Sequence, residues 1–396
     1  MTGMEPVANS DSQKKASLKR ATGKKLEKAA ISLFARKWYN TVSVAEICRE
    51  AGLSNGIFYK YYTGKEELFR KLLETVIDNI RAALSDLGGQ SVTERISAFV
   101  RATMAFSRDM PDQVAVFREG QYRFFEYERK LEELYRNVLT QVLGRDIGEP
   151  EYLFALGGIR FCAIRSALQG IDLDEEAVIE ILRSGIFGGQ SFDPDRVFGG
   201  AIRPLAIELD GGARERLIQA GKRLFGEKGF FETNIHEITD AAGLSVGAFY
   251  SHFSGKETFY AELIRRAGHD VRTFISSNMG GGLNRLEREL RGIWLFLVFL
   301  SIDRNCYEIV REAEFVLRDE VRDYYAAFVE GYRANVDGNG EIAARGPRAE
   351  SAVIEYLLGI AHYSGIDVAF DGSVSNARSV LEAVGKYLQT GFSAYI

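Results

Sequence analysis

Hydrophobic residues recur along most of this chain at the spacing of amphipathic helices. In the first such stretch Leu26, Ala30, Leu33 and Phe34 fall at i, i+4, i+7 and i+8, on one face of a helix. Similar spacing continues towards the C-terminus, and the 396 residues include only six prolines, which suits long helices. The pattern therefore predicts an all-α protein.

One block of this helical pattern occurs twice. Residues 51–66 read AGLSNGIFYKYYTGKE and residues 242–257 read AGLSVGAFYSHFSGKE, so ten of sixteen positions are identical at a constant offset of 191 residues. Further along, Phe117–Glu119 matches Val310–Glu312 at an offset of 193. The chain is therefore expected to consist of two related units, each about half its length.

Each block has the pattern of a helix-turn-helix. Gly52 and Gly243 permit the turn between two helices, where φ is often positive. The serine two residues later can cap the next helix, in which Phe58 and Phe249 face the core. The opposite face presents small residues and hydroxyl groups, which can approach base edges and bond to phosphates. This face predicts double-stranded DNA as a partner.

The repeated block resembles the DNA-binding domain of the tetracycline-repressor (TetR) family, from the turn glycine to the Lys-Glu pair and in the Leu-Phe pair upstream. Two positions depart from the family pattern: Tyr61, where the family more often has the histidine seen at His252, and Trp38, where the second copy has the more typical Gly229. The resemblance implies that the DNA-facing residues are Ser43, Ser54, Asn55, Gly56, Tyr59, Lys60, Tyr61, Lys65, Asn234, Ser245, Val246, Gly247, Tyr250, Ser251, His252 and Lys256.

Ordinary members of this family carry one head and form dimers, so a tandem chain implies a dimer built within one polypeptide. In the family the last two helices of each subunit form a four-helix interface. By this resemblance Tyr152–Gly170 and Glu175–Phe187 are expected to pack on Ala352–Phe370 and Ala377–Phe392. The expected fold is all-α, with two helix-turn-helix heads, each followed by a helical effector and dimerisation domain, as an intrachain pseudo-dimer.

The expected domain boundaries follow from the repeat and from the Gly- and Pro-bearing stretch between its copies. They are a basic flexible arm over residues 1–22, a first head over 23–70, a first helical ligand and dimerisation domain over 71–187, a linker over 188–212, a second head over 213–261 and a second helical domain over 262–396. Assembly of two chains into a particle with four heads stays open.

Both helical domains are rich in aromatic residues, and the resemblance implies that an unknown small-molecule effector binds among them. The alternative interpretation is an ordinary hydrophobic core. The matched pairs Arg118–Glu119 and Arg311–Glu312 either orient a ligand or pair structurally, and the sequence leaves both open. The candidate ligand-binding residues are Arg118, Tyr122, Trp294, Arg311 and Phe315.

Charge is distributed unevenly between the two heads. The whole chain has a net charge of −5, but residues 14–71 carry 14 basic and 5 acidic residues, a net charge of +9. Residues 213–266 carry 8 basic and 7 acidic residues, a net charge of +1. A basic head on an acidic body suits a phosphate-binding module. The first head is expected to supply more of the salt-dependent affinity, with Lys14–Lys25 as an arm along the DNA.

Other functional classes find no support in the residues. The three cysteines are scattered, the four histidines lack metal-ligand spacing, and no G-x-S-x-G motif occurs, so we expect no metal, no cofactor and no enzymatic activity. The N-terminus has no secretory pattern. The longest apolar run, Ile293–Leu300, is far shorter than the roughly 20 residues that span a bilayer, so we expect a cytoplasmic protein without membrane contact.

The sequence predicts a ligand-released transcriptional repressor that reads two half-sites with one chain. The heads differ where they face DNA, because Asn55 corresponds to Val246 and Lys60 to Ser251. Asn can bond to adenine whereas Val offers only apolar contact, so the operator is expected to be non-palindromic. Two alternatives remain: the second head serves only as a dimerisation partner, or the chain is a helical small-molecule-binding protein with one or both heads no longer binding DNA.

Overall fold

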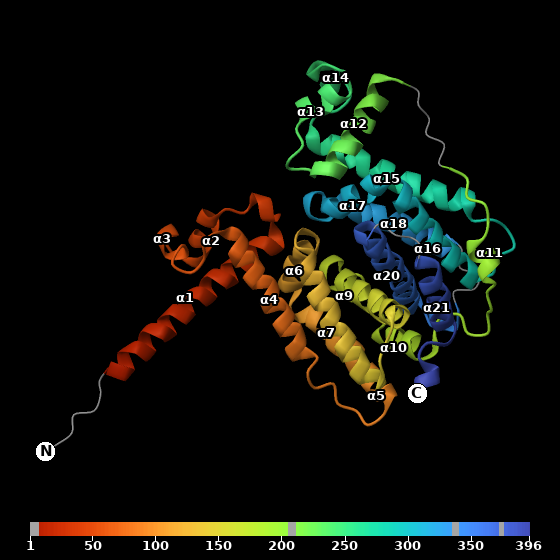
Figure 1. Ribbon diagram of the computed structural model, residues 1–396, viewed down its shortest axis with the longest axis horizontal. Helices are drawn as coiled ribbons and strands as arrows, with labels where there is room; N and C mark the ends of the chain where they lie inside the picture. The colour runs from red at the N-terminus through yellow and green to blue at the C-terminus, as the bar shows by residue number, and fades with distance from the viewer. Residues whose placement is uncertain (1–7, 205–210, 335–339, 372–375) are drawn as a thin grey trace. The chain divides into compact units, whose positions relative to one another are not determined.

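The computed structural model describes residues 8–204, 211–334, 340–371 and 376–396, and every regular element within these ranges is a helix (Figure 1). No helix in these ranges combines the length and the apolar character needed to cross a membrane. The chain forms two compact units, one made of the residues up to Ala83 with Asp109–Leu134, the other of Leu84–Arg108 with Tyr135–Ile396. The all-α prediction is confirmed.

The first unit holds the first head. Its elements are α1 (Ala8–Arg36), the 3-10 helix η1 (Tyr39–Thr41), α2 (Val44–Ala51), α3 (Asn55–Phe58), α4 (Lys65–Ala83), α6 (Pro111–Arg123) and the first part of α7 (Phe125–Leu143). Leu26, Ala30 and Phe34 of α1 are buried, as their spacing predicted. Because α1 begins at Ala8, a helix replaces the expected flexible arm over residues 8–22, where lysine, alanine and leucine favour helix formation. Residues 1–7 of that arm lie outside the described residues.

The helix α6 belongs with the first head, so the unit boundary differs from the domain boundary predicted at residue 70. The Glu119 carboxylate on α6 accepts a hydrogen bond from the backbone N–H of Tyr39 at 2.9 Å, which ties the helix to the head. The helix α5 (Val92–Asp109) forms ion pairs within the second unit, for instance between Arg101 and Glu176. The helical domain predicted over residues 71–187 is therefore divided, with α6 in the first unit and most of α5 in the second.

The second unit holds most of the remaining elements. After α5 and the end of α7 come α8 (Glu149–Tyr152), the π-helical turn η2 (Leu153–Gly157), α9 (Gly158–Gln169), α10 (Glu175–Ser184) and α11 (Pro194–Phe198). The second head contains α12 (Ala213–Lys228), α13 (Ile235–Ala241), α14 (Val246–Tyr250) and the start of α15 (Lys256–Asn278). The last elements are α16 (Arg285–Ile302), α17 (Arg304–Val316), α18 (Arg318–Ala334), α19 (Gly340–Ala343), α20 (Pro347–Asp371), α21 (Ala377–Thr390) and η3 (Ser393–Tyr395).

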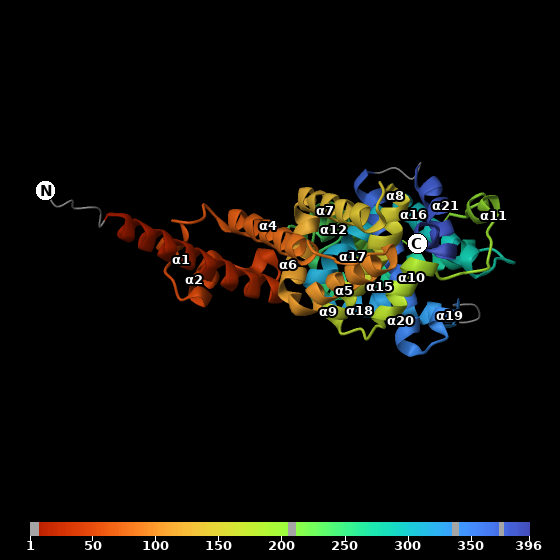
Figure 2. The same cartoon turned by 90° about the horizontal axis from the view of Figure 1, so that it is seen from below.

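The last two helices of each copy pack on one another within the second unit. The helix α9 lies along α20, and α10 contacts both α20 and α21 (Figure 1 and Figure 2). The Ile186 N–H donates to the Leu388 carbonyl at 2.7 Å, and the Phe392 N–H donates to the Leu182 carbonyl at 2.7 Å. Both residue pairs that correspond, Ile186 with Phe392 and Leu182 with Leu388, are 206 positions apart, so the two bonds are related by the repeat. The helices that were expected to pack on one another therefore do so within one chain.

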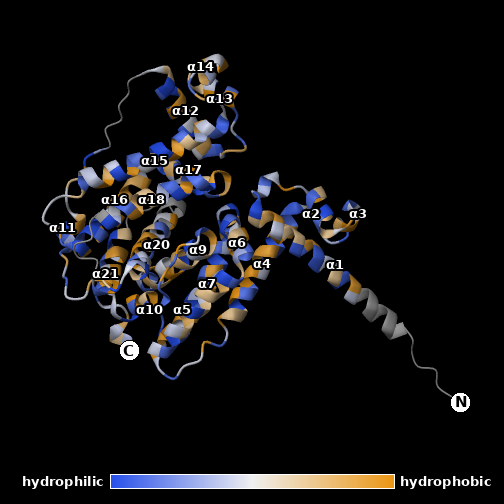
Figure 3. Cartoon of the chain, turned by 180° about the vertical axis from the view of Figure 1, so that it is seen from behind, coloured by the Kyte–Doolittle hydropathy of each residue, from blue (hydrophilic) through white to orange (hydrophobic). Residues whose placement is uncertain are grey.

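A buried ion pair crosses the same interface. The Arg165 guanidinium of α9 lies 2.9 Å from the Glu355 carboxylate of α20, and the two side chains are only 5% and 3% exposed. Nearby, the Tyr356 hydroxyl donates to the Phe154 carbonyl at 2.7 Å. Hydrophobic residues are prominent in α9 and α20 around these groups (Figure 3). Polar bonds inside an apolar interface fix the register of the two helices.

The expected linker over residues 188–212 forms structure on the second unit. The helix α11 packs on α16, where Val197 and Phe198 are buried. The Phe198 ring meets the Trp294 ring edge to face, and the Arg291 guanidinium donates to the Val197 carbonyl at 2.9 Å. Residues 205–210 of the linker lie outside the described residues.

Candidate nucleic-acid interface and ligand cavity

The first helix-turn-helix consists of α2, a glycine turn and α3. Ser43 caps α2, because its Oγ accepts from the Glu46 N–H at 3.2 Å while the Glu46 carboxylate accepts from the Ser43 N–H at 2.9 Å. Gly52 ends α2 with a φ of +67°, a left-handed conformation that favours glycine. Ser54 precedes α3, and Phe58 at the end of that helix is fully buried. The predicted turn and inward face are confirmed.

The second helix-turn-helix repeats this geometry with different caps. The Asn234 side chain accepts from the Glu237 N–H at 3.0 Å, and the Glu237 carboxylate accepts from the Asn234 N–H at 3.0 Å. Gly243 has a φ of +64° at the turn. The Ser245 Oγ caps α14 by accepting from the Ala248 N–H at 3.2 Å. Both heads therefore share a capping box on the helix before the turn and a left-handed glycine at the turn. The predicted cap of the helix after the turn is present only at Ser245, because the Ser54 side chain makes no cap hydrogen bond.

Most residues predicted to face DNA lie on the surface of their head. The rings of Tyr59 and Tyr250 stand out, with 60% and 55% of their surface exposed although both are large. Tyr61 and Val246 are half-buried. The other exposed members of the predicted set are Ser43, Ser54, Asn55, Gly56, Lys60, Asn234, Ser245, Gly247, Ser251 and His252. Contact of this face with DNA stays a prediction.

Two members of the predicted set point towards their own head. The Lys65 ammonium donates to the carbonyls of Tyr39 and Val42 at 2.7 and 2.8 Å. The Lys256 ammonium lies 4.2 Å from the centroid of the Phe230 ring. Burial lowers the pKa of both lysines. Both ammonium groups hold the segment that precedes α2 or α13, in place of the outward direction expected for a phosphate contact.

A glutamate joins each head to the helix behind it. The Glu312 carboxylate of α17 accepts from the Phe230 N–H at 2.6 Å, just as the Glu119 carboxylate of α6 accepts from the Tyr39 N–H. Tyr39 and Phe230 are 191 positions apart, and Glu119 and Glu312 are 193 apart, so the junction is the same in both copies. Of the two roles that the sequence left open for the Arg–Glu pairs, the glutamates have the structural one.

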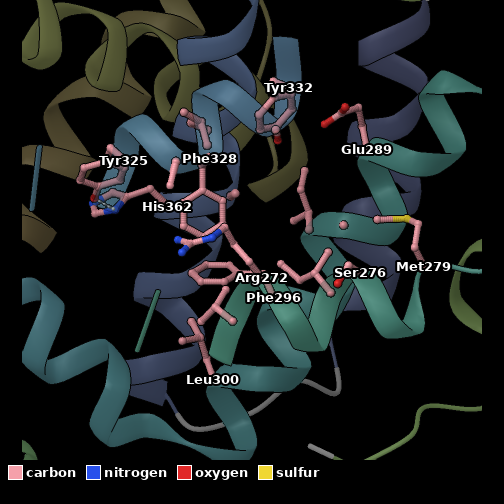
Figure 4. A pocket seen from close by; sticks show the side chains of 18 of the residues that line it. Arg272, Ser276, Met279, Glu289, Phe296, Leu300, Tyr325, Phe328, Tyr332 and His362 are labelled. Atoms are coloured by element: carbon pink, nitrogen blue, oxygen red, sulfur yellow. Dashed lines mark hydrogen bonds between the residues drawn. The ribbon is translucent and has the colours of Figure 1, made fainter. Parts of the chain in front are cut away.

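The second helical domain contains a cavity of about 630 Å³, partly open to solvent, between α15, α16, α17, α18 and α20 (Figure 4). This volume is typical of small-molecule sites. Its walls are mostly apolar, with Val271, Ile293, Phe296, Leu300 and Phe328 among the lining residues. The cavity therefore suits a ligand with an apolar body.

Polar groups lie at two ends of this cavity. The Arg272 guanidinium is directed towards the end that carries Tyr325 and His362, whereas Glu289 and Tyr332 lie together at the other end (Figure 4). Burial raises the pKa of the Glu289 carboxyl, although its ion pair with Arg285 acts in the opposite direction.

The cavity includes only part of the predicted ligand-binding set. Arg311 lines it, as expected. Trp294 and Phe315 do not line it. Arg118 and Tyr122 lie on α6 in the first unit. These four predicted residues are therefore not part of the cavity in the second domain. Aromatic content could not identify the lining residues, because buried aromatic side chains look alike in sequence whether they face a cavity or a filled core.

Comparison with known families identifies the same two heads. The family of bacterial regulatory proteins called the tetR family matches at residues 26–72 and again at residues 217–263. These segments run from within α1 into α4 and from within α12 into α15. Each match therefore covers one complete helix-turn-helix.

Curated relatives are bacterial helix-turn-helix regulators. The chain is 27% identical over 134 residues to the uncharacterized HTH-type transcriptional regulator YfiR of Bacillus subtilis (strain 168), which is 31% of this chain and 64% of that protein. It is 33% identical over 66 residues to the HTH-type transcriptional repressor DhaR of Mycobacterium sp. (strain GP1), which is 17% of this chain and 33% of that protein. It is 24% identical over 108 residues to the HTH-type transcriptional activator FasR of Mycolicibacterium smegmatis, which is 27% of this chain and 49% of that protein. The chain thus spans less than two thirds of the length of each of these relatives.

Two solved structures of transcriptional regulators each match slightly less than half of this chain. The transcriptional regulator FadR from Bacillus subtilis, in complex with stearoyl-CoA, has a TM-score of 0.38 and 16% identity, and the match covers 45% of this chain and 98% of that chain. A transcriptional regulator from Aquifex aeolicus VF5 has a TM-score of 0.33 and 20% identity, with the same coverage of 45% and 98%.

Proposed function

Because the chain belongs to the tetR family of bacterial regulatory proteins and carries the family's DNA-binding domain twice, we propose that it is an effector-released transcriptional repressor that reads two half-sites with one polypeptide. One observation carries the proposal: two complete helix-turn-helix heads stand on a chain whose last helices already pair with each other. The pseudo-dimer takes the place of the two-fold symmetric dimer that single-headed regulators need.

In the bound state α3 and α14 enter successive major grooves, whose centres lie roughly 34–36 Å apart. The exposed hydroxyls of Tyr59 and Tyr250 reach the DNA backbone, and the small residues Gly56 and Gly247 let each helix approach the base edges. Such backbone contacts position the protein, whereas contacts to base edges provide sequence specificity.

The operator is asymmetric because the two heads differ on this face. Asn55 is exposed at the position where the second head has the half-buried Val246, and Lys60 is exposed where the second head has Ser251. An asparagine bonds to adenine, whereas a valine contacts only apolar groups such as a thymine methyl. The Ser251 hydroxyl also donates to the Gly247 carbonyl of its own helix at 2.9 Å. Lys60 instead offers a charged group to the DNA.

The effector acts through α17. This helix contributes Tyr307 and Arg311 to the cavity, and it holds the second head through the Glu312 bond and through an ion pair between Asp303 and Lys222 of α12. A ligand that favours another position of α17 therefore moves the second head. DNA dissociates because the two heads no longer fit their grooves together and the gain from bivalent binding is lost.

The test is selection of DNA from a random library with the intact protein, followed by the mass of the selected complex. We expect a two-part, non-palindromic site bound by one chain. A palindrome bound by two chains would show that only one head of each chain reads DNA and that the second head is a dimerisation partner. No enrichment at low or high salt would reject the regulator and leave the helical small-molecule-binding protein.

A matched pair of variants tests which head reads which half-site. Lys60→Ser and Ser251→Lys exchange one outward residue between the heads, so each should change the preference in a different half of the selected site. The slope of log affinity against log salt should fall by about 1 for Lys60→Ser, since one phosphate contact is lost. Unchanged half-site preferences in both variants would contradict the assignment.

A further inference from the structure

We propose that each chain binds one small organic anion with an apolar body, in the cavity of the second copy, and that the first copy has no equivalent site. This inference rests on the effector-released regulator proposed above and names the chemistry and the stoichiometry of its ligand. It follows from a comparison of the two copies, position by position, around the cavity.

The structure supports a constant alignment of the two helical domains. In the first copy the Glu94 N–H donates to the Ser91 hydroxyl at the start of α5, and in the second copy the Glu287 N–H donates to the Asn284 side chain at the start of α16. These capping pairs are 193 positions apart, and α5 and α16 are both 18 residues long. Residues that differ by 193 therefore occupy equivalent places on these helices.

Two glycines open the cavity in the second copy. Gly292 and Gly331 line it, and the equivalent residues of the first copy are Phe99 and Val138. A β-carbon added at Gly292 would meet only a Met279 methyl at 3.8 Å, and one added at Gly331 would meet nothing within 4 Å. A side chain at either position would thus enter open space, which at Gly331 is exposed to solvent.

Two alanines extend the same difference. Ala327 and Ala267 line the cavity, where the first copy has Leu134 and, at the offset of 191 that applies to α4 and α15, Val76. The four larger residues of the first copy are all buried, exposing at most 9% of their surface: Val76, Phe99, Leu134 and Val138. In the first copy these positions carry core side chains, whereas in the second they are small and border a cavity.

At two further positions the second copy has the larger, charged residues and the first copy has apolar ones. The buried pair of Arg285 and Glu289, 2.7 Å apart, lines the cavity where the first copy has the apolar Val92 and Ile96. A buried ion pair costs desolvation energy, so its presence beside a cavity is more easily explained by a polar ligand than by stability. Since the two charges compensate each other, they leave the net charge of the cavity unchanged.

Among the described residues, Arg272 and Arg288 are the lining arginines that have no carboxylate at ion-pair distance. Arg288 is exposed to solvent, whereas Arg272 is half-buried and its guanidinium lies 5.6 Å from the centroid of the Phe328 ring. By contrast Arg311, which also lines the cavity, pairs with Glu308 at 2.9 Å. The Glu314 carboxylate also lines the cavity, where it accepts a hydrogen bond from the Tyr325 hydroxyl at 3.1 Å. An arginine beside aromatic rings, at the polar end of an apolar cavity, favours a carboxylate, sulfonate or phosphate with a hydrophobic body.

The test uses two fluorescent probes that share one apolar body: anilinonaphthalene sulfonate, which is an anion, and phenylnaphthylamine, which is neutral. Binding is measured by fluorescence titration on the intact protein without DNA, so the result does not depend on DNA binding. We expect one molecule of the sulfonate per chain. Arg272→Gln should weaken the sulfonate about tenfold or more and leave the neutral probe nearly unchanged.

The first copy supplies the matched control. Arg81 is equivalent to Arg272 and pairs with Asp78 on the surface, so Arg81→Gln should leave both probes unchanged. Gly331→Val places the first copy's residue into open space of the second and should weaken both probes, with a helical signal equal to that of the unaltered protein. Two sites per chain, equal effects of Arg272→Gln and Arg81→Gln, or full binding by a folded Gly331→Val protein would each overturn the proposal. Loss of DNA binding with intact probe binding would instead reject only the regulator.

Discussion

Glu312 accepts a hydrogen bond from the backbone N–H of Phe230 at 2.6 Å, and this bond connects the second head to a helix that also lines the cavity. The neighbouring Arg311 faces the cavity, so adjacent residues of α17 serve the ligand side and the head side. The first copy has the same bond between Glu119 and Tyr39. The hydrogen bond between head and helix is therefore present in both copies, whereas the cavity reported above is lined by the helix of the second copy, α17.

Removing this carboxylate should loosen the segment before α13. In Glu312→Ala the Phe230 N–H loses its acceptor, which costs about 1–3 kcal/mol for a buried donor. We expect faster hydrogen exchange over residues 229–233 in peptide-resolved mass spectrometry. Glu312→Gln keeps an acceptor oxygen and should retain most of the protection. Glu119→Ala should affect residues 38–41 and leave 229–233 unchanged; equal exchange in Glu312→Ala and the unaltered protein would show that the bond does not hold the head.

The two backbone hydrogen bonds between the ends of the two copies, from Ile186 to Leu388 and from Phe392 to Leu182, bring the chain segments so close that two positions must be glycine. Gly391 has a φ of +56°, and a β-carbon there would lie 2.6 Å from the Arg183 backbone; Gly185 has a φ of +78° and the same distance to the Gln389 backbone. Gly391→Ala should lower the free energy of unfolding by about 1–3 kcal/mol from backbone strain alone, with the steric overlap adding to it. Gly170→Ala is the control, since Gly170 also has a positive φ but open space around it.

Urea unfolding would measure this difference. The chain has two tryptophans, so in a Trp38→Phe background the fluorescence of Trp294 reports on the second unit alone. We expect Gly391→Ala and Gly185→Ala to unfold at lower urea concentrations than Gly170→Ala. Identical midpoints for the three variants would mean that the crossing tolerates a methyl group.

The capping glutamates should make the heads sensitive to acid. A hydrogen bond with Lys37, together with bonds from Ser43, lowers the pKa of Glu46 to about 2, below its ordinary value of 4.5. A carboxyl with a lower pKa in the folded state stabilises that state above the unfolded pKa, and this contribution is lost as the pH falls from about 5 towards 2. Lys228 and the Asn234 backbone lower the pKa of Glu237 in the same way.

Carbon-detected NMR titration of the glutamate carboxyls would measure these pKa values directly. Lys37→Met should raise the pKa of Glu46 towards its ordinary value and leave Glu237 unchanged, and Lys228→Met should do the reverse. Titration of Glu46 near 4.5 in the unaltered protein would contradict the capping geometry.

The sequence was sufficient for features that depend on local spacing. The turn glycines Gly52 and Gly243 and the inward Phe58 and Phe249 follow from short-range rules, and repetition at one offset reinforced them. The direction of Lys65 did not follow, because it depends on carbonyls more than twenty residues away. The repeat itself contained a signal for the cavity that composition did not reveal: glycine and alanine inside helices of the second copy, where the first copy has large residues.

The ion pair between Arg165 and Glu355 should be a source of specificity more than of stability. Arg165→Met leaves the buried Glu355 carboxylate without its cation, and breaking such a pair typically costs about 3–5 kcal/mol. Replacing both partners, as Arg165→Met with Glu355→Leu, removes the uncompensated charge and should recover most of that loss, because two desolvated charges give way to apolar contacts. Unfolding in urea, followed through Trp294 in the Trp38→Phe background, would compare the three proteins. If the double variant were as unstable as Arg165→Met, the pair would be stabilising in its own right, and the interface would depend on it for more than register.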